Sequence, residues 1–109
     1  MTDDELVTRV ATDVMGWRMS VDGGWWHMGD GAVLPSGGLY GWNPLTNDAH
    51  MDMVLAKADF WHMKVWVIKM GKNPHVSADV DGRAKASDSG YTMASIKRAM
   101  LQAIVEAVG

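Results

Sequence analysis

Aromatic side chains surround a glycine-rich segment, residues 29–41, in the first half of this 109-residue chain. Aromatic rings of this kind can stack a nucleobase, a contact worth roughly 1–3 kcal/mol per base. The candidates for such contacts are Trp25, Trp26, His27, Tyr40 and Trp42. Because long connections in compact domains are often functional, this pattern favours a ligand site beside the segment.

A nucleotide also carries phosphate, and two features of the sequence fit an anion. Thr46 stands where a helix is expected to begin, and the free amide groups at a helix start favour negative charge. Basic side chains are available at Arg18, Arg83 and Lys85. We therefore add Thr46 and these three basic residues to the candidate ligand-binding residues.

A second interpretation places most of the indole rings in the core. Neighbouring residues on a strand face opposite ways, so only one of Trp25 and Trp26 would be exposed. The remaining tryptophans would then fill the interior, as large aromatic side chains commonly do. These core candidates are Trp17, Trp42, Trp61 and Trp66.

Catalytic and metal-binding patterns are missing from the sequence. Its four histidines do not form H-E-x-x-H, and His50 and Asp52 would point to different faces of a helix. No serine lies in G-x-S-x-G, and the glycines do not form a phosphate-binding loop of known type. We expect a protein that is not an enzyme and that uses neither a metal nor a cofactor.

Length and charge restrict the partners further. A chain of this size is typical of one domain, so we expect residues 1–109 to form a single domain. A net charge of -3 argues against sequence-independent binding to nucleic acid, which requires many phosphate contacts from lysine and arginine. The acidic start at Asp3, Asp4 and Glu5 and the lack of a long apolar run predict a cytoplasmic protein with no membrane partner.

The first half of the sequence predicts a helix, a hairpin and a second helix. Thr2 and Glu5 form a capping box ahead of an apolar stripe that Gly16 is placed to end. Alternating residues from Trp17 to Met28 then predict a hairpin, and residues 29–41 a loop in which Pro35 opposes regular structure. Pro44 ends that loop, and Thr46 or Asn47 can cap a helix of about 12 residues.

The second half predicts three strands and a closing helix. Residues 61–70 are apolar on both faces, which favours a central strand covered on both sides. Residues 75–80 alternate cleanly, Asp81-Gly82 is a hairpin signal, and residues 83–87 suit a charged edge strand. Thr92 can cap a last helix with a broad apolar stripe. The predicted fold is α+β, in the order αββαβββα, with three helices packed on an antiparallel sheet of about five strands.

Three segments of the chain resemble the bacteriophage family called the phage ABA sandwich domain. The first helix ends in Val14-Met15-Gly16-Trp17, which matches the family's V-M-G-W ending, and Trp42-Asn43-Pro44-Leu45-Thr46 matches its W-x-P-x-T entry to the second helix. The closing helix, Ala94 to Ile104, completes the resemblance in the same order. It departs from the family in its many methionines and in residues 29–41. The resemblance implies a phage-encoded α+β domain and carries over no catalytic residues.

Together these features predict a non-enzymatic phage accessory protein that binds a small ligand or a host protein. Its most specific form is a module that sequesters a nucleotide immune signal of the host. The alternative is a structural or protein-interaction domain that self-associates, as a homo-oligomer, through methionine-rich surface and has no small-molecule ligand.

Overall fold

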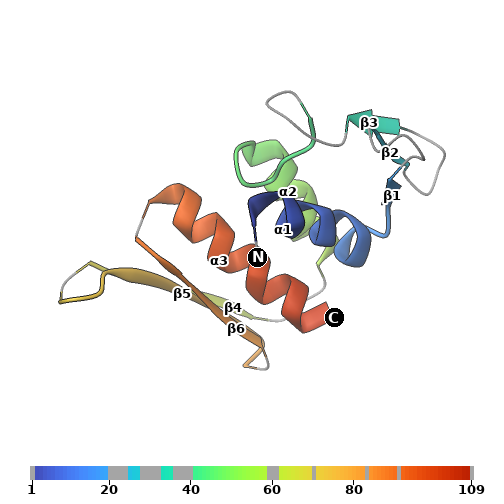
Figure 1. Ribbon diagram of the computed structural model, residues 1–109. Coiled ribbons are helices and arrows are strands. Elements are labelled where there is room, and N and C mark those ends of the chain that lie inside the picture. Colours follow the sequence, from blue (N-terminus) through green and yellow to red (C-terminus); the bar gives the residue numbers. More distant parts are fainter. Residues whose placement is uncertain are drawn as a thin grey trace. The chain divides into compact units, whose positions relative to one another are not determined.

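The computed structural model describes residues 2–19, 25–27, 33–35, 41–58, 62–69, 71–82, 84–90 and 92–108. The chain divides into two compact units, Met1–Lys57 and Ala58–Gly109, and each is described by itself. Figure 1 labels their helices and strands. Among the described residues, no helix has the length and apolar character needed to cross a membrane.

The first unit opens with α1 (Asp3–Arg9), which continues directly into a π-helical turn, η1 (Val10–Val14). The Thr2 hydroxyl accepts the backbone N–H of Glu5 at 3.2 Å, as the capping box predicts. Gly16 follows with a positive φ of 74°, which suits a glycine at a helix end. The predicted stripe is buried at Leu6, Val7, Val10, Ala11 and Val14.

Three short strands form an antiparallel sheet in this unit, in the order β1-β2-β3. They are β1 (Arg18–Met19), β2 (Trp25–His27) and β3 (Val33–Pro35). The pairing of β1 with β2 confirms the predicted hairpin. The prediction that all of residues 29–41 form a loop is wrong, because β3 pairs with β2 there. Pro35 is tolerated because β3 is an edge strand.

Helix α2 (Asp48–Lys57) completes the first unit, and the structure confirms how it begins. The Asn47 side chain accepts the backbone N–H of His50 at 3.2 Å, so Asn47 rather than Thr46 is the cap. Just before it, the Asn43 side chain accepts the N–H of Leu45 at 2.9 Å. Met51 and Val54 form the buried side of the helix.

The second unit contains one antiparallel sheet in the order β4-β5-β6. Its strands are β4 (Met63–Ile68), β5 (His75–Val80) and β6 (Ala84–Ser89). The predicted alternation of β5 is confirmed, with Val76, Ala78 and Val80 buried. Asp81 and Gly82 both have positive φ, as the hairpin signal predicts.

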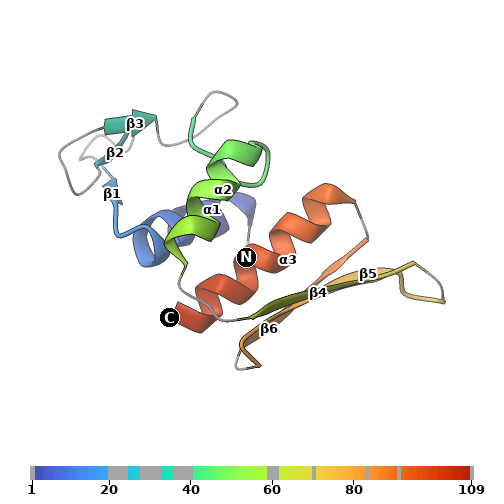
Figure 2. The ribbon, with the colours of Figure 1, turned by 180° about the vertical axis from the view of Figure 1, so that it is seen from behind.

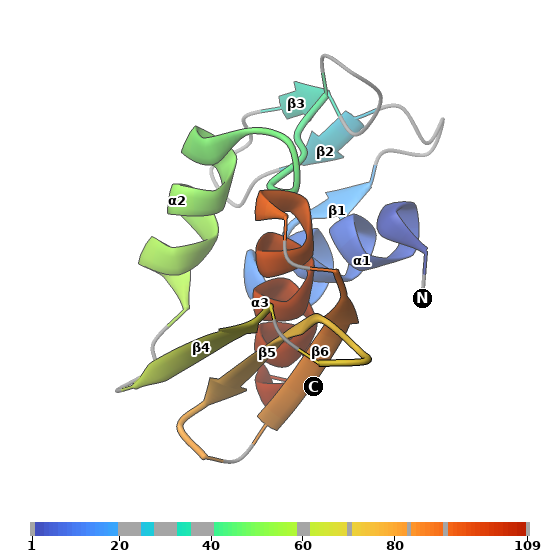
Figure 3. The same cartoon turned by 90° about the vertical axis from the view of Figure 1, so that its left-hand side faces the viewer.

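Helix α3 (Met93–Val108) packs on β5 and β6, as Figure 3 shows. Its sheet-facing contact includes an ion pair in which Arg98 donates to the Asp88 carboxylate at 3.1 Å. The apolar stripe is buried at Ala99, Leu101, Ala103, Ile104 and Val105. The helix therefore lies on one face of this unit's sheet, over β5 and β6, and no helix of the unit lies on the other face (Figure 2).

Two predictions about the sheets need correction. Residues 63–68 do not form a central strand covered on both sides, because β4 is an edge strand and Val65, Trp66, Val67 and Ile68 are exposed. The α+β class and the order of helices hold. The expected single sheet of about five strands is not confirmed, since the described strands form two sheets of three.

Candidate functional site

The face of the β4-β5-β6 sheet that α3 does not cover is the candidate site. Side chains alternate between faces along a strand, so the partners of buried Val76, Ala78 and Val80 lie on the helix side. The intervening residues form the other face, which we call the open face. From β4, β5 and β6 it includes Lys64, Trp66, Ile68, His75, Ser77, Asp79, Lys85, Ser87 and Ser89.

The strand register orders these side chains into rows across the sheet. Trp66 pairs with Ser77, and Ser77 pairs with Ser87, so one row runs from an indole ring to two hydroxyl groups. The adjacent row places Asp79 between Lys64 and Lys85. Residues in such rows lie close enough for one ligand to contact several of them.

A depression of about 410 Å³ lies over the first of these rows. Its lining residues on the open face are Trp66, Ile68, Ser77, Lys85 and Ser87, and it is also lined by Ala78 and Ala86. Trp66 is 46% exposed and Ile68 41% exposed. Lys85 is the only charged residue in this lining, so the depression combines an accessible ring, hydroxyl groups and one cation.

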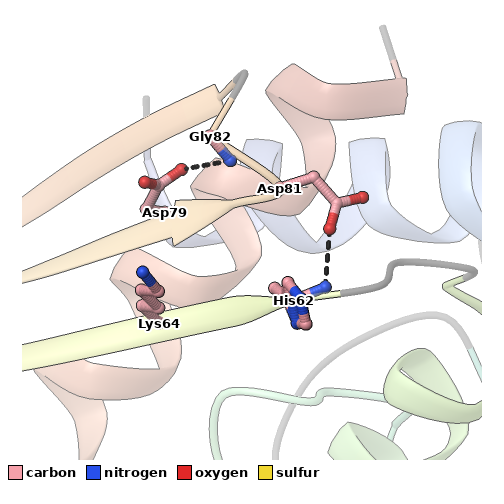
Figure 4. Close-up of a pocket in the computed structure, with 5 residues that line it drawn as sticks. All are labelled: His62, Lys64, Asp79, Asp81 and Gly82. Carbon is pink, nitrogen blue, oxygen red and sulfur yellow. Dashed lines mark hydrogen bonds between the residues drawn. The ribbon is translucent and has the colours of Figure 1, made fainter.

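A second depression, of about 390 Å³, lies at the turn end of the same sheet. Figure 4 shows its lining residues, which are His62, Lys64, Asp79, Asp81 and Gly82. Both carboxylates are engaged, because Asp79 accepts the backbone N–H of Gly82 at 3.0 Å and Asp81 accepts that of His62 at 2.6 Å. These bonds fix the turn, and Lys64, the lysine of this lining, lies opposite Asp79 in the strand register.

Of the candidate residues predicted in the first unit, one is buried and two are exposed among those whose side chains are described. Trp42 is a core residue, 1% exposed, with the Trp17 ring edge-on at 4.9 Å and the His50 ring stacked at 5.9 Å. Its interpretation as core is therefore favoured over a role as a stacking platform. Thr46 and Arg18 are exposed.

Other predicted site residues fall where side chains are not described. Trp25, Trp26 and His27 lie on β2, of which the backbone pairing alone is described. Tyr40 and Arg83 lie outside the described residues, as does Trp61. A site around the glycine-rich segment accordingly stays a prediction. Lys85 is the predicted site residue that lines a described depression.

His50 has a structural role in this unit. The backbone N–H of Asn43 donates to His50 Nδ1 at 2.9 Å, which requires that nitrogen to be unprotonated. Across the described ranges, no group of three or more histidine, aspartate, glutamate or cysteine side chains is arranged to hold a metal ion.

Of the residues that line this depression, the sequence pattern predicts Lys85 as a site residue but not Trp66, Ile68, Ser77 or Ser87. The pattern of residues 61–70, apolar on both faces, predicts a core position for Trp66, because periodicity does not show whether a face is covered. Comparison with known protein families, curated proteins and solved structures gave no match to this chain.

Proposed function

We propose that this protein is a non-enzymatic binding module that takes a nucleotide-like ligand on the open face of its second sheet. One observation carries the proposal: the exposed Trp66 lines the same depression as Lys85, Ser77 and Ser87, all of which lie on the open face. An exposed indole can stack on any nucleobase, and a lysine contacts phosphate as a point charge.

The depression has an apolar side and a polar side, and this difference would orient a bound nucleotide. Ile68 and Trp66 form the apolar side of the depression on β4, and Lys85 and Ser87 form its polar side on β6. A base would lie against the indole, and the phosphate would lie towards Lys85. The hydroxyls of Ser77 and Ser87 would bond the sugar or the base edge.

The sequence motifs guide the choice of ligand to test. Because they resemble a bacteriophage family, nucleotide signals made by a bacterial host are the first class to examine, with cyclic dinucleotides and ADP-ribose derivatives as probes. In that setting the protein would act by sequestering its ligand, which needs affinity and no catalysis.

Calorimetric titration of wild-type protein and matched variants tests this proposal. Trp66→Ala should weaken binding by about five- to 150-fold, the factor that corresponds to losing roughly 1–3 kcal/mol of stacking. Lys85→Ala should weaken binding and reduce its dependence on salt. Met93→Ala and Lys72→Ala are controls, since both residues are exposed and neither lines the depression.

Two results would contradict the proposal. One is an absence of binding to every nucleotide at millimolar concentration. The other is binding that survives Trp66→Ala but is lost in Trp25→Ala or Trp26→Ala, which would place the ligand beside the glycine-rich segment.

A further inference from the structure

We infer that β4 is a self-association edge through which two copies of this chain pair antiparallel about a two-fold axis. Within the described residues, β4 has a strand neighbour on one side only, which is β5. Its other edge presents main-chain N–H and C=O groups over six residues, Met63–Ile68. Such an edge is a template for another strand.

β4 carries a single charged side chain, Lys64, as protection against pairing with another strand. Val65, Trp66, Val67 and Ile68 are consecutive, apolar and exposed, and the strand contains neither proline nor an internal bulge. The opposite edge, β6, instead carries Lys85 and Asp88 among small residues. Charged or interrupted edges discourage pairing, whereas an apolar, regular edge favours it.

The sequence of β4 is complementary to itself in one antiparallel register. With Trp66 opposite Trp66 of the second copy, Val65 lies opposite Val67 of that copy, and the two valine pairs share the helix-side face. Aromatic and β-branched pairs of this kind stabilise antiparallel sheets. Both copies keep their sheet faces aligned, because a two-fold axis perpendicular to the sheet relates them.

Charge does not oppose a second copy in this register. Lys64 lies opposite Ile68 of the second copy, so the two Lys64 side chains are separated by four residues along the strands, about 13 Å. That separation exceeds the Debye length of about 8 Å at physiological salt, and repulsion is largely screened. Parallel pairing in register would instead place lysine beside lysine. The result is a continuous six-stranded sheet with β6 at both outer edges.

The chain contains no cysteine, so introduced cysteines report this register directly. Opposed residues in an antiparallel pair have Cα atoms about 4.5–5.5 Å apart, within the range that a disulfide spans. Under mild oxidation Trp66→Cys should form a covalent dimer. Ile68→Cys and Lys64→Cys should each form no disulfide-linked dimer, because neither position faces itself. The Lys64→Cys, Ile68→Cys double variant, which retains Trp66, should form a covalent dimer.

Sedimentation velocity over a wide concentration range supplies the second readout. The wild-type chain should show a concentration-dependent dimer that Val65→Lys abolishes, because this change places two new positive charges near the two-fold axis. Leu55→Lys is the matched control, since Leu55 on α2 is 38% exposed against 37% for Val65. Circular dichroism should show that both variants remain folded.

A wild-type chain that stays monomeric at all concentrations would overturn the inference, as would a dimer that Val65→Lys leaves intact. Self-cross-linking at Val65→Cys or Val67→Cys instead of Trp66→Cys would overturn the register. The proposed ligand site lies on the other face from Val65. Measuring the nucleotide affinity of Val65→Lys therefore tests ligand binding separately from strand pairing, because this change disrupts the pairing edge but not the ligand site.

Discussion

Trp42 and Trp66 occupy opposite environments in the described part of the chain. Trp42 contacts the rings of Trp17 and His50 and is almost fully buried. Its indole Nε1 is buried with no hydrogen-bond partner among the described residues, so packing rather than polar contact accounts for its role. Trp66 leaves nearly half of its surface in solvent.

Truncation of these two residues should therefore have very different effects on the free energy of unfolding. Trp42→Ala should lower the free energy of unfolding by about 3–5 kcal/mol, because it removes a large buried side chain and leaves a cavity. Trp66→Ala should lower it by less than about 1 kcal/mol, as is usual for exposed positions. Urea unfolding followed by circular dichroism measures both. Equal losses would show that Trp66 is also a core residue.

His50 supports a second prediction, which concerns the joint between the glycine-rich segment and α2. His50→Phe keeps a ring beside Trp42 but removes the acceptor for the Asn43 N–H. Leaving that donor without a partner should cost about 1–3 kcal/mol of stability. His62→Phe is the control, because His62 is exposed and its backbone rather than its ring makes the described bonds. A His50→Phe variant as stable as this control would contradict the assignment.

Among the elements, the connection from β6 to α3 sets how the helix lies on its sheet. Gly90 has φ of 91°, and an added Cβ would lie 3.2 Å from the Ser95 hydroxyl. That hydroxyl donates to the Ser89 carbonyl at 3.3 Å, while the Thr92 hydroxyl accepts the Ser95 backbone N–H at 3.2 Å. These bonds join the end of the strand to the start of the helix.

Gly90→Ala should consequently destabilise the protein more than Gly71→Ala. Both glycines have positive φ, which costs a residue with a side chain about 1 kcal/mol or more, but the added Cβ at Gly71 meets nothing within 4 Å. The difference between the two variants isolates the contact with Ser95. Thermal unfolding compares them directly, and equal shifts would mean that Ser95 moves aside without loss.

The elements were predicted well where one local signal decided the structure. The capping box at Thr2, the alternation of residues 75–80 and the Asp81-Gly82 turn each specify their own geometry. The role of β4 was not predictable in this way. Its apolar pattern shows that Trp66 and Val67 point to opposite faces, whereas exposure depends on which strand pairs with it and on where α3 packs.

β3 was missed for a related reason. Pro35 argues against a central strand, but an edge strand tolerates proline on the side that makes no ladder bond. The same two errors, over the burial of β4 and over β3, also affect the prediction of the candidate site. The sequence drew attention to the tryptophans beside the glycine-rich segment, while the described depression that contains an exposed ring is formed by long-range pairing of β4, β5 and β6.

At the scale of the whole molecule, the two compact units contain different candidate features. The first, Met1–Lys57, contains the buried Trp42 and the joint of α2, and the second, Ala58–Gly109, contains the open face. A chain with a net charge of -3 offers local rather than general attraction for an anion, and Lys85 provides that local charge. A small ligand that combines a ring with few charges fits this arrangement better than a long polyanion does.

The proposed ligand site on the open face is tested most directly by following the tryptophan indole N–H signals by NMR while a nucleotide is titrated into the protein. If the ligand binds the open face, the Trp66 indole signal and the backbone signals of Ser77, Lys85 and Ser87 should shift together and saturate at one ligand per chain, while the Trp42 indole signal stays in place. Shifts confined to Trp25, Trp26 and Tyr40, or an absence of shifts at saturating nucleotide, would contradict the proposed site.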